Sequence, residues 1–107
     1  MPPRIEGAGK TEIIEVIEGH TTYISCSASG FPDPTVIWMK EGVPLVDGVH
    51  SNKRELSNGR QLEVRQVGPK DEGLYRCQAT NVAGQRAKNY RLKVLCEFSF
   101  GAHNLCC

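Results

Sequence analysis

The sequence lacks any apolar run long enough to cross a membrane. A membrane-spanning helix needs roughly 18 or more consecutive apolar residues, whereas the apolar residues here come in short runs. The opening Met1-Pro2-Pro3 also lacks the basic start and apolar stretch of a secretory signal. We therefore expect no membrane span, and we expect any secretory signal to lie upstream of this sequence. We favour Met1 as an expression start placed before a Pro-Pro linker, with a genuine initiator as the alternative.

The chain has little excess charge of either sign. Thirteen Lys and Arg stand against twelve Asp and Glu, for a formal net charge of +1, and the basic residues are spread along the chain. Domains that bind nucleic acid concentrate positive charge on one face or along one element. The composition therefore argues against a nucleic-acid partner.

Catalytic motifs are missing as well. No Ser, His and Asp arrangement and no close carboxylate pair falls in a recognisable nucleophile or acid–base motif. No Asn-x-Ser or Asn-x-Thr sequon occurs, so every face stays open to protein contact. We expect no enzyme activity, no cofactor and no small-molecule substrate.

What is present suits one globular domain built from β-strands. The chain has 107 residues, 39% hydrophobic and 23% charged, which leaves room for a single core. No segment reads as a long helix, and short alternating runs recur roughly every 8 to 12 residues between turn signals, as in an antiparallel sandwich. In residues 21–28, for example, Ile24 and Cys26 fall on one face and Tyr23 on the other. Further strands are expected at residues 11–17, around Val36 and Trp38, around Leu62 and Val64, at residues 74–79 and 87–95, and as short edge strands within residues 46–57.

Two cysteines and a tryptophan carry the first resemblance to a known family. Cys26 and Cys77 lie about 50 residues apart on apolar faces of predicted strands, and Trp38 follows the first cysteine by about a dozen residues. This order resembles the immunoglobulin fold, in which the two cysteines bridge the sheets and the tryptophan packs against them. The resemblance implies a Cys26–Cys77 disulfide, which would stabilise the fold by roughly 4 kcal/mol in the chain-entropy model.

Residues 71–77 give the strongest single match. They read Asp-Glu-Gly-Leu-Tyr-Arg-Cys and reproduce the family pattern Asp-x-Gly-x-Tyr-x-Cys, with Gly73 in its place. The resemblance implies that Tyr75 forms a tyrosine corner, its ring inside and its hydroxyl bonded to backbone a few residues upstream. It also implies that Asp71 pairs with Lys53 or Arg54, an interaction worth about 1 kcal/mol or less if partly exposed. Leu62 is assigned to the core.

Two further segments are similar to intermediate-set (I-set) immunoglobulin modules of the hemicentin, titin and cell-adhesion families. They are residues 38–45 and 79–84, and the opening residues 2–7 look most like the domain junctions of hemicentins. The resemblance extends over residues 2–95. We therefore predict an all-β, immunoglobulin-like I-set antiparallel sandwich with one inter-sheet disulfide, spanning residues 10–95. Residues 1–9 form a linker and N-terminal strand region, and residues 96–107 a tail of uncertain origin.

The tail contains the remaining cysteines. Of five cysteines in all, the predicted disulfide leaves Cys96, Cys106 and Cys107, whose pairing stays open. With His103 they suggest zinc ligation, but their spacing fits no common zinc motif. The terminal Cys-Cys also resembles a prenyl acceptor, which a disulfide-forming domain would not present to the cytosolic enzyme. We therefore assign no metal and no lipid anchor.

Strand alternation predicts a candidate contact face. If Val36 and Trp38 point inward, Ile37 and Met39 point outward, beside Arg76 and Arg91 of the last hairpin. Apolar side chains rimmed by basic ones suit a protein interface, although scattered surface apolar residues give the same pattern.

Three functions compete on this evidence. The first is a non-catalytic adhesion or structural module of an extracellular matrix or cell-surface protein, secreted or part of an ectodomain, that contacts other proteins, including neighbouring immunoglobulin-like domains. The second is an intracellular sarcomeric module of the titin kind, in which the cysteines stay reduced. The third is an accessory domain of a larger enzyme or receptor.

Overall fold

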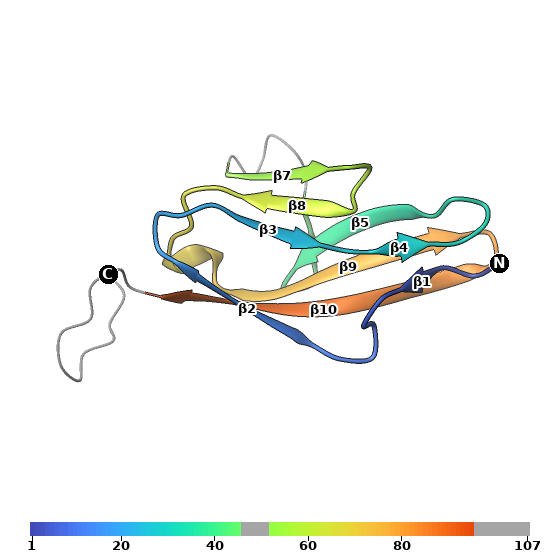
Figure 1. Ribbon diagram of the computed structural model, residues 1–107, viewed down its shortest axis with the longest axis horizontal. Helices are drawn as coiled ribbons and strands as arrows, with labels where there is room; N and C mark the ends of the chain where they lie inside the picture. Colours follow the sequence, from blue (N-terminus) through green and yellow to red (C-terminus); the bar gives the residue numbers. More distant parts are fainter. Residues whose placement is uncertain (46–51, 96–107) are drawn as a thin grey trace.

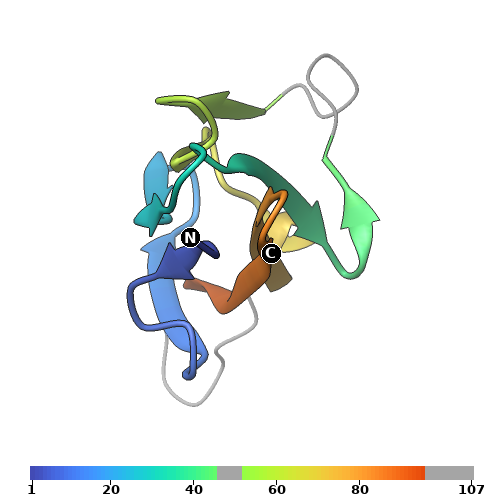
Figure 2. The same ribbon diagram turned by 90° about the vertical axis from the view of Figure 1, so that its right-hand side faces the viewer.

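The computed structural model describes residues 1–45 and 52–95 and shows the predicted sandwich (Figure 1). The five-stranded sheet has the order β2-β10-β9-β5-β6, and the facing sheet has the order β3-β8-β7. A short pair, β1 with β4, continues the second layer toward the N-terminal end, as the end-on view shows (Figure 2). The strands are β1 (Arg4–Ile5), β2 (Glu12–Ile17), β3 (Thr22–Ser25), β4 (Ala28–Ser29), β5 (Thr35–Lys40), β6 (Val43–Pro44), β7 (Lys53–Leu56), β8 (Gln61–Val64), β9 (Gly73–Asn81) and β10 (Gly84–Leu95).

The predicted strands appear where the alternation placed them. In β3 the side chain of Ile24 is buried and that of Tyr23 is exposed, as expected for a strand with one face against the core. The predicted edge strands within residues 46–57 are represented by β7, and residues 46–51 lie outside the described ranges. The tail, residues 96–107 with Cys96, His103, Cys106 and Cys107, also lies outside them.

One pairing departs from the antiparallel rule. β2 runs parallel to β10, with Glu12 beside Tyr90 and Ile17 beside Leu95. The cause is the path of the chain: β1 pairs with β4 in one layer, and residues 6–11 then cross to the other layer before β2 begins. An edge strand that changes layer in this way meets β10 in the parallel direction.

The core lies between the two sheets. Its fully buried members include Trp38, Tyr75, Tyr90, Ile24, Leu62, Leu92, Val64 and Val67, and a 3₁₀ turn, η1 (Pro69–Asp71), closes one end. Ile5 of β1 also belongs to this cluster. Within the described residues η1 is the only helical segment, and no helix there is long and apolar enough to cross a membrane.

Two of the hairpin turns use different chemistry. Between β5 and β6 both central residues, Glu41 and Gly42, have positive φ, as a type I′ turn requires. In the turn from Asn81 to Gly84, Asn81 does not adopt positive φ. Its side-chain Oδ1 instead accepts a hydrogen bond from the N–H of Ala83 at 2.8 Å. Asparagine acts there as a local acceptor.

Candidate protein-interaction site

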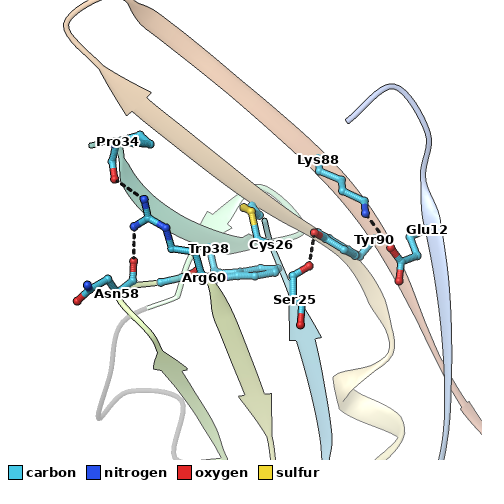
Figure 3. The surroundings of a disulfide bond; sticks show 11 residues. Glu12, Ser25, Cys26, Pro34, Trp38, Asn58, Arg60, Lys88 and Tyr90 are labelled. Atoms are coloured by element: carbon cyan, nitrogen blue, oxygen red, sulfur yellow. Dashed lines mark hydrogen bonds and ion pairs between the residues drawn. A yellow bond between two sulfur atoms is a disulfide. The ribbon is translucent and has the colours of Figure 1, made fainter. Parts of the chain in front are cut away.

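A disulfide and a tryptophan fix the centre of the molecule (Figure 3). Cys26 and Cys77 are bonded to each other and fully buried, and Trp38 lies directly beside Cys77 in the register of β5 and β9. The indole Nε1 donates to the carbonyl of Gly59 at 2.7 Å, so its one polar atom is satisfied inside the protein. The predicted disulfide and the predicted place of Trp38 beside it are both present in the structure.

Gly59 is a residue that the sequence did not single out. Its φ is +85°, and a Cβ there would lie 2.7 Å from the backbone oxygen of Val36. Only glycine allows both this conformation and this close approach, and the resulting geometry aims its carbonyl at Trp38. No motif in one sequence signals this role, because it depends on a contact between segments distant in the chain.

The structure forms the tyrosine corner expected at Tyr75. Its hydroxyl donates to the backbone oxygen of Asp71 at 2.6 Å, and its ring is fully buried. Burial raises the pKa of this phenol well above its ordinary value, with the carboxylates of Asp71 and Glu41 adding to the effect. The phenol is therefore a hydrogen-bond donor throughout the physiological range.

Asp71 is more deeply buried than the sequence suggested. Its carboxylate accepts from Lys53 Nζ at 2.6 Å, from Asn52 Nδ2 at 3.0 Å and from the N–H of Gly68 at 2.9 Å. The Lys53 and Asp71 side chains expose 6% and 1% of their surface, so the pair is not the partly exposed one for which a small contribution was expected. Burial alone would raise the pKa of Asp71, but the bonds from Lys53, Gly68 and Asn52 outweigh it and lower this pKa. Lys53 is thus the basic partner.

Arg54, the other candidate partner, points elsewhere. Its guanidinium lies 3.7 Å from Glu63 on the neighbouring strand. Alternation explains the choice, because successive residues of β7 face opposite sides of the sheet, and only Lys53 faces Asp71.

Tyr90 forms a second anchor that the sequence analysis missed. Its hydroxyl donates to the carbonyl of Ser25 at 2.7 Å and its ring lies 5.4 Å from that of Trp38 (Figure 3). The ammonium of Lys88 lies 4.9 Å from the ring centre and pairs with Glu12 at 2.7 Å. The alternation of Tyr90, Leu92 and Val94 along residues 87–95 would have been sufficient to predict this inward position.

We call the solvent side of β2, β10, β9 and β5 the outer face. The register places Ile37 opposite Gln78 and Met39 opposite Arg76, and it places Arg91 one strand further along the sheet, opposite Leu74. Ile37 exposes 43% of its surface, Arg76 and Arg91 are exposed, and Met39 is half-buried.

The outer face extends further than the sequence suggested. Ile13 of β2 lies beside Arg91 and exposes 58% of its surface. Ile17 and Leu95, which lie beside each other at the far end of these strands, are also exposed. Strand alternation in residues 11–17 could have predicted this extension, but not that β2 joins β10, which depends on the crossing of layers.

In the part of the chain that the structure describes, no group of three or more His, Cys, Asp or Glu side chains is arranged to hold a metal ion.

Known proteins match this chain over most of its length. Residues 6–94 match the family model described as immunoglobulin I-set domain. The chain is 40% identical to human hemicentin-1 over 94 residues, 41% identical to mouse hemicentin-2 over 96 residues, and 30% identical to chicken neural cell adhesion molecule 1 over 95 residues. These alignments cover 88%, 87% and 88% of this chain but 2%, 2% and 9% of the relatives, so the chain spans a small part of their length.

Solved structures share the same architecture. Titin domains Z1Z2 in complex with telethonin superpose with a TM-score of 0.81 at 27% identity, covering 92% of this chain and 50% of that chain. Extracellular domains 3–5 of Drosophila OTK superpose with a TM-score of 0.77 at 33% identity, covering 88% of this chain and 31% of that chain.

Proposed function

Because this chain belongs to the immunoglobulin I-set family, we propose that it is a module through which an extracellular multidomain protein contacts other proteins and spaces its own domains. The I-set domain is itself non-catalytic. The relatives include an adhesion protein by name, neural cell adhesion molecule 1, and titin domains that form complexes with telethonin and with an obscurin-like domain. Protein contact is the function common to these relatives.

The observation that carries the proposal is the exposed apolar content of the outer face. Ile37 and Ile13 expose 43% and 58% of their surface on a rigid sheet, with Arg76 and Arg91 between them. Apolar anchors supply most of the binding free energy in protein interfaces, while rim charges mainly adjust the association rate. Ile37 and Met39 are therefore the proposed anchors, and Arg76 and Arg91 the proposed rim.

The extracellular assignment is supported by the disulfide and by the hemicentin similarity. Disulfides persist in oxidising compartments and are rare in the cytosol. The likeness to titin domains favours a second candidate, an intracellular structural module in which Cys26 and Cys77 are reduced. An accessory domain of a larger enzyme or receptor is compatible with the same fold.

We also propose the extent of the module. Residues 10–95 are the I-set domain, residues 1–9 add a linker and an N-terminal strand that contributes Ile5 to the core, and residues 96–107 are a tail of uncertain origin. The family match at residues 6–94 supports an end near residue 95.

The contact face can be tested by matched substitutions. Immobilised neighbouring domains of the parent protein and a matrix extract would be assayed against the parent chain, Ile37→Asp, Arg91→Ala and Val82→Asp. Val82 is a control because it exposes 91% of its surface on the turn after β9, away from the outer face. We expect Ile37→Asp to weaken binding by more than about tenfold and Arg91→Ala by less than about threefold.

Two outcomes would reject this face. One is an Ile37→Asp variant that folds normally and binds as well as the parent chain. The other is a loss of binding in Val82→Asp alone, which would move the contact to the loops at residues 31–34 and 81–84.

A further inference from the structure

The first half of β10 has an open edge. β10 pairs with β9 over Gly84–Leu92, but β2 pairs with it only from Tyr90 to Leu95. In Figure 1 the orange end of β10 extends beyond β2 and runs beneath β1, which pairs with β4 in the other layer. Among residues 1–45 and 52–95, no strand pairs with the outer edge of Gln85 through Lys88.

The register shows which backbone groups face that edge. The carbonyl of Leu95 accepts from the N–H of Glu18, just after β2, whereas the N–H of Val94 points the other way and donates to Glu72. Odd-numbered residues of β10 therefore turn their backbone groups away from β9. Since N–H and C=O groups alternate sides along a strand, Gln85 and Ala87 present theirs to the open edge.

Clefts flank this edge on both sides of the sheet. One, of about 990 Å³, lies between β1, β4 and the start of β10 and is lined in part by Gln85 and Arg86. The other, of about 330 Å³, is lined by Ala8, Arg76, Gln78, Gln85, Arg86 and Ala87. An added strand sends its side chains alternately to the two faces of a sheet, so each face here has room for them.

The charged residues of β10 are all basic, although Glu6 also lines the larger cleft. β10 carries Arg86, Lys88, Arg91 and Lys93 and no acidic residue. Lys88 is paired with Glu12 and Lys93 lies beside Glu15, whereas the ion pairs of the described residues include neither Arg86 nor Arg76. The smaller cleft therefore has two arginines and no carboxylate in its lining.

We propose that this edge of β10 is a strand-addition site for an extended, acidic segment of a partner protein. Backbone hydrogen bonds to Gln85 and Ala87 would hold the segment, and carboxylates on its two faces would meet Arg76 on the outer face and Arg86 on the opposite face. The inference rests on the proposed function as a protein-contact module, but it uses the sheet edge in place of the outer-face anchors. Basic residues on a sheet edge can also prevent edge-to-edge aggregation without binding any partner. The peptide experiment below distinguishes that role from binding of an acidic segment.

A synthetic peptide in which glutamate alternates with valine is the probe, and a lysine-for-glutamate version is its control. Binding to the whole chain would be followed by amide chemical shifts and hydrogen exchange. We expect the acidic peptide to slow exchange at the Gln85 and Ala87 amides and to bind at least about tenfold more tightly than the basic one. No perturbation of these amides at millimolar acidic peptide would overturn the proposal and leave the deterrent role.

Two variants sharpen the result. Ala87→Pro removes an N–H that faces the edge, not β9, so peptide protection should be lost while the remaining amide shifts stay native. If that variant does not fold, Arg86→Glu should reverse the preference in favour of the basic peptide. Protection that survives both changes would refute the edge site.

The outer-face variant keeps this test separate from the proposed function. Ile37→Asp should leave peptide protection unchanged, because Ile37 lies on β5, two strands away from the edge. A loss of protection in Ile37→Asp would place the peptide on the outer face and refute the edge site. If Ile37→Asp instead binds protein partners normally while the peptide still protects Ala87, the edge proposal holds and the outer-face proposal fails.

Discussion

Two ion pairs between an aspartate and a basic residue lie at opposite ends of the sandwich and differ mainly in burial. Asp71 and Lys53 are 2.6 Å apart near η1, with 1% and 6% of their side chains exposed. Asp33 and Arg60 are 2.9 Å apart in and near the loop between β4 and β5, with 79% and 21% exposed. Figure 1 shows η1 and that loop at the two ends of the long axis.

The comparison shows that surroundings, and not distance, decide what such a pair contributes. The Asp71 carboxylate also accepts bonds from Asn52 and Gly68, so removing it breaks three hydrogen bonds and leaves the Lys53 ammonium without its carboxylate. Asp33 faces water, which replaces the lost partner at little cost. One end of the domain is therefore fixed by a buried polar network, while the other is held by contacts that solvent can replace.

The largest effect should come from removing the buried carboxylate. We expect Asp71→Ala to lower the free energy of unfolding by about 3 to 5 kcal/mol, because Lys53 is left buried and unpaired. Asp33→Ala should cost about 1 kcal/mol or less. Urea denaturation followed by the fluorescence of Trp38, the single tryptophan, measures both. Equal losses in the two variants would contradict the comparison.

Acid should weaken the end of the sandwich that contains Asp71. The folded pKa of Asp71 lies below the ordinary value of an aspartate, so its contribution to stability is complete above that ordinary value and is lost as pH falls through the folded pKa. Asp71→Ala should therefore show a smaller further loss of stability on acidification than the parent chain.

A smaller effect is expected at the neighbouring tyrosine corner. Tyr75→Phe should lower the free energy of unfolding by about 1 to 3 kcal/mol, because the backbone oxygen of Asp71 loses its buried donor while the ring still packs. Val82→Ala, at a position with 91% exposure, is the surface control and should change stability by less than about 0.5 kcal/mol. An unchanged denaturation midpoint in Tyr75→Phe would show that the corner contributes nothing.

The smallest effect on stability is predicted for the tail. Deleting residues 96–107 should leave the denaturation midpoint unchanged and reduce covalent aggregates, because three of the five cysteines are removed with it. Non-reducing electrophoresis and urea denaturation of the truncated chain measure the two outcomes. A truncated chain that fails to fold would make the tail part of the sandwich.

Much of the fold was predictable because its signals are local. Period-two alternation and turn residues located the strands, and the order of Cys26, Trp38, Tyr75 and Cys77 identified the sandwich. These signals also placed Ile37, Arg76 and Arg91 on the solvent side of the sheet. Such features depend on neighbours in the sequence, and one chain contains enough information to read them.

The remaining features depend on contacts between distant segments. Gly59 is required by the close approach of Val36, and Asn52 matters only because folding brings it to Asp71. The open edge of β10 follows from where the chain crosses between layers before β2, a point that no local pattern specifies. Burial of the Lys53–Asp71 pair likewise became evident only once both sheets were assembled.

The oxidation state of the two core cysteines tests the proposed extracellular role most directly. The measurement is peptide mapping without reduction of the parent protein recovered from its native source, with free thiols blocked at lysis. The account predicts one peptide pair linked through Cys26 and Cys77. Recovery of both residues as blocked free thiols would contradict it and would support the intracellular, titin-like role.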